Sequence, residues 1–289
     1  MKLPFKKTEA AIGEILRASL PEIERLGVAR WACSLTNGEA HPMTVCVAGD
    51  GWLVMDVPLR ELSTPGERWE FLQVNRRLAG LSKLVLAANN RAARLRAEIP
   101  LGDELGVEHR LRETCTDFEA ALASCSGHRL VSEPHRLTTE AQTAHCDLPA
   151  LCAEAGWASS QGSGVVRVEL NGQRGFLQAT LETEASGSVR AYVDLASCGS
   201  WAPESRWALA SLLLSASRVV RLARGFAEQS NRLLTVGFEV RFGDPPSAFE
   251  LAHAFGALSA ACELTREEAR VLEDASVAKA YLDIRMGVS

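Results

Sequence analysis

The segment Leu233–Phe242, LLTVGFEVRF, is where the fold is easiest to derive. Its apolar residues occupy every second position: Leu234, Val236, Phe238, Val240 and Phe242. Alternation with a period of two predicts a β-strand that buries one face. Gly243 and the following Pro245-Pro246 pair end the strand, because proline cannot donate to a ladder of hydrogen bonds.

The same pattern occurs earlier in the chain, in Arg91–Ile99 (RAARLRAEI), whose Glu98-Ile99 returns at Glu239-Val240. Other landmarks return in the same order: Leu20-Pro21 and Gly27 as Leu148-Pro149 and Gly156, Asn37-Gly38 as Asn171-Gly172, Met55-Asp56-Val57 as Val193-Asp194-Leu195, Arg68-Trp69 as Arg206-Trp207, and Phe118–Cys125 as Phe255–Cys262. An unchanged order of landmarks indicates a tandem duplication of one unit. We therefore assign residues 1–125 and 147–289 to two units and residues 126–146 to a linker.

Each unit is predicted to run helix, three strands, helix, two strands, helix. Short turns such as Asn37-Gly38 and Asn89-Asn90 join neighbouring strands, so the strands are antiparallel. Such a sheet needs helices on one face, which makes the fold class α+β. The opening helix of the first unit is expected over Ser19–Gly27, where Ser19 and Glu22 have the spacing of a capping box.

Two further helices are expected outside this plan. One, about Thr8–Arg17, precedes the first unit, and the other begins at Thr265, where Glu268 completes a capping box, and runs to about Met286. The second helix of each unit, Pro65–Ala79 or Pro203–Ser215, is expected at the contact between the units. The latter helix has apolar residues on more than one side, as a helix buried on two faces requires.

This element order resembles the type III secretion chaperone-like fold family. The segment that carries the resemblance is a short strand, Lys83–Leu86, then Asn89-Asn90, then Leu95–Leu101 with its acidic residue and apolar pair. Its second copy comprises Ser217–Leu222, Ser230-Asn231 and Thr235–Phe242. Members of this family usually dimerise and bind extended segments of client proteins without catalysis. The resemblance implies that two tandem copies form a pseudo-dimer within one monomer rather than a homodimer.

The composition disfavours several classes of partner. The chain has 31 Lys and Arg against 36 Asp and Glu, and a net charge of -5 is a poor match for nucleic acid. No uncharged apolar run reaches the length of about 18 residues that spans a membrane, and the first residues lack the apolar core of a secretory signal. Eight cysteines are scattered without a Cys-x-x-Cys pair. We therefore expect a cytoplasmic protein with reduced thiols and no membrane association.

The candidates for metal binding or catalysis are weak. Histidines and cysteines gather near the linker: Cys125, His128, His135, His145, Cys146 and Cys152. Zinc sites use closely spaced ligand pairs, which these irregular spacings lack. Cys146 stands before a helix capped by Asp147, the position that would activate a nucleophile, but incidental neighbours explain it more simply. We expect no cofactor, no bound metal and no catalytic residue.

Six residues are candidates for partner binding or for the unit interface: Trp69, Arg94, Arg96, Trp207, Arg218 and Arg221. The two tryptophans occupy equivalent helix positions, where large aromatic residues are typical of a core or an interface. The arginines are either ordinary solvated side chains or a basic patch that binds an acidic peptide.

The favoured function is a non-catalytic, chaperone-like module that binds an extended polypeptide at its exposed sheet edges. A regulatory or structural adaptor that binds a folded partner is one alternative. An enzyme with dispersed catalytic residues is another. The C-terminal helix is expected to be either a lid over the binding surface or a part of the core.

Overall fold

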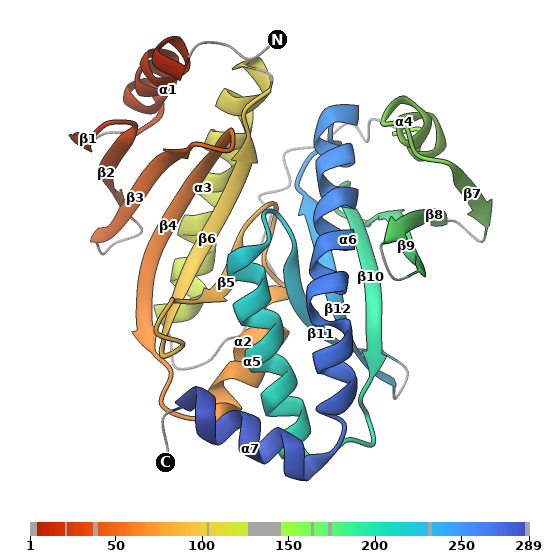
Figure 1. Cartoon of the computed structure of the whole chain (residues 1–289). Helices are drawn as coiled ribbons and strands as arrows, with labels where there is room; N and C mark the ends of the chain where they lie inside the picture. Colours follow the sequence, from red (N-terminus) through yellow and green to blue (C-terminus); the bar gives the residue numbers. More distant parts are fainter. Residues whose placement is uncertain are drawn as a thin grey trace.

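The computed structural model describes residues 5–20, 22–36, 40–102, 104–126, 146–162, 165–172, 175–230 and 233–286. Within these residues the chain forms seven helices and twelve strands, arranged as two six-stranded antiparallel sheets with helices packed against them (Figure 1). The α+β fold class predicted from the sequence is confirmed. No helix in the described ranges is long and apolar enough to cross a membrane.

The first unit contains α1 (Phe5–Ser19), β1 (Ile23–Gly27), β2 (Arg30–Thr36), β3 (Ala40–Ala48), β4 (Trp52–Glu61), α2 (Pro65–Asn75), β5 (Lys83–Leu86), β6 (Ala92–Pro100) and α3 (Glu104–Ser126). The second contains α4 (Leu148–Glu154), β7 (Ser159–Gly162), β8 (Val165–Gly172), β9 (Gly175–Thr183), β10 (Val189–Ser197), α5 (Pro203–Val219), β11 (Arg224–Ser230), β12 (Leu233–Phe242), α6 (Ala248–Val271) and α7 (Ala275–Met286).

The two sheets have the same strand order. The first runs β1-β2-β3-β4-β6-β5 and the second β7-β8-β9-β10-β12-β11. The registers of the central strands also correspond. Asp56 of β4 lies opposite Arg96, two residues before Glu98, and its counterpart Asp194 of β10 lies opposite Gly237, two residues before Glu239. Two sheet units of one topology fit the tandem arrangement predicted from the repeated landmarks.

Each sheet has one strand more than predicted, because β1 and β7 were not expected. Ser19–Gly27 is not a helix: α1 ends at Ser19, and β1 pairs with β2. Ala29, with a φ of 51°, lies in the turn between the two strands. Pairing with β2 therefore outweighs the local capping signal. Helix α1 stands before β1 as α4 stands before β7, so α1 has a counterpart and is not an additional helix.

The start of β11 also differs from the prediction. Helix α5, which was expected to end at Ser215, continues through Val219, inside the segment Ser217–Leu222 that was expected to repeat the short strand, and β11 starts at Arg224. Ser217, which is fully buried, donates to the Leu213 carbonyl within the helix. The residues between form a loop in which Leu222 has a φ of 60°. We call residues 220–223 the second-unit loop and residues 76–82, which join α2 to β5, the first-unit loop.

At the C-terminal end, Thr265 does not begin a helix. It lies inside α6, is fully buried, and its hydroxyl donates to the Ala261 carbonyl at 2.8 Å. A threonine hydroxyl bonds in this way without ending a helix. Asp274 instead accepts from the Ser276 and Val277 amides at the start of α7.

The second helices of the two units meet, as predicted. Helix α2 packs against α5, and each also crosses to the other sheet: α2 lies against β11, and α5 lies against β5. Helices α3 and α6 pack against the first and second sheet, respectively (Figure 1). This exchange places the edge strands β5 and β11 at the boundary between the units, leaving β1 and β7 as the outer edges.

Candidate functional site

A buried ion pair lies on each side of the boundary between the units. In the first unit, Lys83 of β5 pairs with Glu98 of β6, and both side chains are fully buried. The second-unit loop closes this pair. The Lys83 ammonium donates to the Val220 carbonyl at 3.0 Å, and the Leu222 amide donates to Glu98 at 3.0 Å. Glu98 was predicted on a solvated strand face, but this loop covers it.

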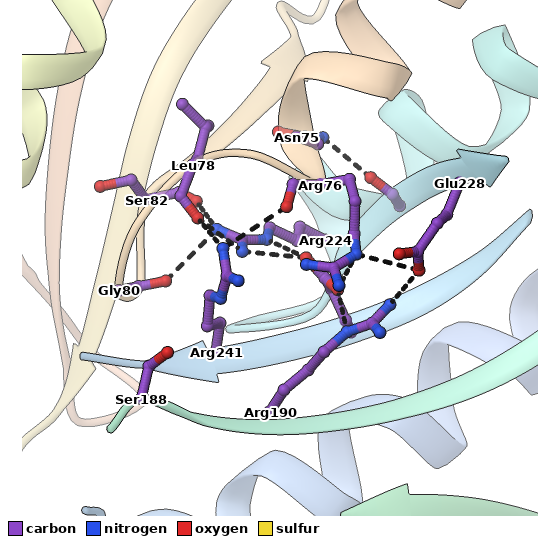
Figure 2. Close-up of polar contacts among 12 residues, drawn as sticks. Asn75, Arg76, Leu78, Gly80, Ser82, Ser188, Arg190, Arg224, Glu228 and Arg241 are labelled. Atoms are coloured by element: carbon purple, nitrogen blue, oxygen red, sulfur yellow. Dashed lines mark hydrogen bonds and ion pairs between the residues drawn. The ribbon is translucent and has the colours of Figure 1, made fainter. Parts of the chain in front are cut away.

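The second unit has the reciprocal arrangement. Arg224 of β11 pairs with Glu239 of β12 at 2.9 Å, and the Arg224 guanidinium donates to the Leu78, Gly80 and Ser82 carbonyls of the first-unit loop (Figure 2). Figure 2 also shows Arg76, Arg190 and Arg241 converging on this cluster. Burial raises the pKa of Glu239, but the four surrounding arginines outweigh it and hold the pKa below its usual value.

Each buried pair thus depends on a loop of the other unit. A buried charge is costly unless its remaining hydrogen-bonding positions are satisfied. Asn75 adds a link between the two edge strands, because its amide donates to the Leu84 and Gly225 carbonyls, both at 3.0 Å. The boundary is therefore a single polar core shared by both units.

The predicted arginines of the two units come together beside this core. Arg94 and Arg96 of β6 donate to Asp56 at 2.6 and 2.7 Å, and Arg96 also reaches the Arg218 carbonyl at 3.3 Å. Arg221, in the second-unit loop, lies 3.6 Å from Glu98. These arginines come from two distant segments of the sequence, and the structure brings the segments together. We call Arg94, Arg96, Arg218 and Arg221 the arginine face.

An open groove adjoins the arginine face. It has a volume of about 490 Å³ and is lined by Trp52, Val219, Val220, Arg221, Ala252, His253, Gly256, Ala257 and Ala260. Trp52 and Asp56 are separated by four positions on β4, so their side chains lie on the same face of the sheet. Arg221 belongs to both features. The groove is therefore continuous with the arginine face.

The groove has mainly apolar walls. The rings of His253 and Trp52 pack edge to face with centroids 5.4 Å apart. Val219, at the end of α5, is 59% exposed although it is a large apolar residue. Gly256 leaves open space on this side of α6, since a Cβ built there meets nothing within 4 Å. The groove therefore offers apolar surface that is open to solvent.

In the first unit, α3 lies close to its own loop. A Cβ built on Gly80 of that loop would lie 2.1 Å from the Asp117 carboxylate of α3. The groove was not predicted, because Trp52, Val219 and His253 come from three distant segments. An exposed valine beside a basic residue is too weak a signal to identify it.

Trp69 and Trp207 lie at the contact between α2 and α5, both half-buried. The Arg206 guanidinium is 6.0 Å from the centroid of the Trp69 ring. The Trp207 indole nitrogen would lie 3.9 Å from a Cβ on Gly66 of α2. Their placement agrees with the interpretation as interface residues, and neither lines the groove.

The described cysteines do not have the properties of nucleophiles. Burial raises the pKa of Cys146, and the nearby Asp147 carboxylate raises it further. Burial raises the pKa of Cys33 to about 11 and that of Cys262 to about 12. A protonated thiol is a poor nucleophile and a poor metal ligand. Of the candidate metal ligands near the linker, His128, His135 and His145 lie outside the described residues.

In comparisons with known proteins, no family model matched the chain, and neither a curated protein nor a solved structure matched it.

Proposed function

We propose that this chain is a non-catalytic binding protein for an extended polypeptide that carries acidic residues next to apolar ones. An apolar side chain enters the groove, and neighbouring carboxylates lie on the arginine face. The observation that carries the proposal is that Arg221 lines both features, so one ligand reaches both. The two units then act as an internal pseudo-dimer, with the binding surface at their boundary.

Charge and shape both support this ligand. The arginine face carries the guanidinium groups of Arg94, Arg96 and Arg221, whereas its acidic partners are Asp56 and Asp50, because Lys83 neutralises Glu98. The excess of positive charge favours a partner with carboxylates. The groove volume falls within the range of about 300–1,000 Å³ that is usual for ligand pockets.

Binding at the outer sheet edges is less well supported. Strand β1 exposes the charged Glu24 and Arg25 and has an irregular register between Arg25 and Gly27. Charges and bulges on an edge oppose the addition of another strand. Strand β7, Ser159–Gly162, is short. The groove is therefore the stronger candidate for contact with the chaperone-type client that the family resemblance implies.

The test is fluorescence anisotropy with a short labelled peptide in which glutamates alternate with leucines. We expect saturable binding that weakens with salt, because exposed charge interactions are screened. Replacing the glutamates by lysines should abolish binding. Arg221→Gln should weaken it by about tenfold or more, since a hydrogen bond to a charged group is worth about 1.5–3 kcal/mol.

Two variants complete this design. Gly256→Leu should block the groove and abolish binding while α6 remains intact. Arg112→Gln is the matched control, because Arg112 is an exposed arginine on α3 that pairs only locally with Glu108. The proposal is wrong if Arg112→Gln and Arg221→Gln affect binding equally, or if the glutamate and lysine peptides bind alike.

A further inference from the structure

A second cluster bridges the two units at a place that shares no residue with the groove. His109 and Glu113 stand four residues apart on α3, and so lie on one face of that helix. Asp244 follows β12 in the other unit, and its carboxylate is 3.1 Å from the His109 ring. One ligand atom from each of these three side chains lies within 4.8 Å of the other two.

The local charge is suited to a dication. Arg110 donates to Glu113 and to Glu250, at 2.7 Å in both cases. The Glu113 and Glu250 carboxylates share the Arg110 guanidinium and the Asp244 carboxylate lies beside His109, so three carboxylates and one guanidinium give the cluster a net charge of -2. Glu113 accepts the hydrogen bond from Arg110 through Oε2.

Arg110 also fixes the segment that carries Asp244. Its guanidinium donates to the Asp244 and Pro245 carbonyls, at 3.4 and 3.3 Å. The Arg110 side chain is 3% exposed, so these contacts are part of the packed structure. Asp244 is therefore held opposite α3 before any ligand arrives, as groups around a metal site usually hold its ligands.

We propose that His109, Glu113 and Asp244 bind one divalent transition-metal cation, for which zinc has the best match. One imidazole nitrogen and two carboxylate oxygens suit zinc, whereas calcium and magnesium favour sites made of oxygen alone. Tetrahedral zinc ligands lie about 3.4 Å apart, so only small side-chain movements are needed. Three protein ligands leave a position for water. This site departs from the metal-free protein expected from the sequence.

The cation would link the units, because two ligands come from α3 and one comes from the loop after β12. A ligand that binds only the folded protein raises its stability by mass action. Zinc should therefore raise the melting temperature of the full chain, and it should do so independently of any polypeptide ligand. The failure of this proposal would leave the proposed polypeptide binding untouched.

The test is calorimetric titration of chelator-treated full-length protein with zinc chloride. We expect one equivalent to bind at this site, and His109→Ala to weaken that binding by more than about tenfold. His41→Ala is the control, since His41 of β3 lies outside both the cluster and the groove. Titration with cobalt separates this site from a cysteine site, because a site with nitrogen and oxygen ligands lacks the strong charge-transfer band of a cobalt thiolate.

The expected result is binding that His109→Ala greatly weakens and His41→Ala leaves unchanged, without a thiolate band. Asp244→Asn should also remove the rise in melting temperature caused by zinc. The proposal is overturned if His109→Ala binds zinc as tightly as the unmodified protein, if the cobalt complex shows the thiolate band only, or if no saturable binding occurs.

Discussion

Glu239 lies at the centre of the best-connected charge cluster in the described part of the chain. Its carboxylate contacts Arg190 at 2.6 Å and Arg224 at 2.9 Å, and its side chain is fully buried. Neutralising it would leave Arg224 buried with carbonyl acceptors but no counter-charge. Losing one member of a buried pair typically costs about 3–5 kcal/mol.

We expect Glu239→Gln to lower the free energy of unfolding by about this amount, measured by urea denaturation. Glu108→Gln is the matched control, because Glu108 pairs with Arg112 on an exposed helix surface, where such pairs are worth about 0.5 kcal/mol or less. Similar losses in both variants would show that Glu239 has no special structural role.

Acid should destabilise the protein for the same reason. The pKa values of Glu239, Glu184 and Glu250 are lowered in the folded protein. Burial opposes this lowering, but neighbouring arginines, together with hydroxyl donors at Glu184 and Glu250, outweigh the effect of burial. Each therefore contributes stability that is present above the ordinary carboxyl pKa and is lost as pH falls through the lower folded value. Melting temperatures measured from pH 7 downwards should start to fall near about pH 5. Glu239→Gln should flatten this dependence, and an unchanged slope would contradict the assignment.

At the scale of elements, Gly225 sets how closely the helices approach β11. A Cβ on this glycine would lie 2.8 Å from the Leu213 Cβ of α5 and 3.1 Å from Leu72 of α2. Gly225→Ala should destabilise the protein by about 1–3 kcal/mol, as overpacking does. Gly256→Ala on α6 is the control and should raise stability by about 0.5–1 kcal/mol, because it meets no neighbour and improves a helix. Equal responses in thermal unfolding would refute the close approach.

Helix α7 belongs to the core rather than to a lid. It packs on α5, and the Ser205 hydroxyl near the start of α5 donates to the Glu273 carbonyl just before α7. Helix α7 crosses one end of α5 (Figure 1), whereas the groove is lined by Val219 at the other end of α5. Ending the chain after Asp274 should therefore lower the melting temperature, because Ala278 and Leu282 are buried, without changing affinity for the glutamate–leucine peptide. Tighter peptide binding by the truncated protein would restore the lid interpretation.

Elements with strong local signals were predictable from the sequence. Thr64 and Ser247 form complete capping boxes at the starts of α2 and α6, and β12 buries its predicted alternate residues. The failures occurred where tertiary contacts override a local signal. Thr265 has the spacing of a capping box but bonds back within α6, and Val219 has strand propensity but continues α5.

In the molecule as a whole, the sequence repeat predicted that the two units contact each other, but it did not predict the buried ion pairs at their boundary. Lys83, Glu98 and Glu239 occur in amphipathic strands, where charged residues usually face water. Their burial follows from loops that come from the other unit, which no local pattern in the sequence encodes. The residues of the arginine face were identified individually, yet their convergence depends on the same exchange of α2 and α5 between sheets.

We propose that the boundary between the units, rather than the outer sheet edges, binds an acidic polypeptide. Hydrogen exchange of the backbone amides, with and without the glutamate–leucine peptide, distinguishes these two places. We predict increased protection in residues 219–222 and 252–260, with none in β1 or β7. Protection confined to Ile23–Gly27 or Ser159–Gly162 would instead indicate strand addition at the edges and would contradict this account.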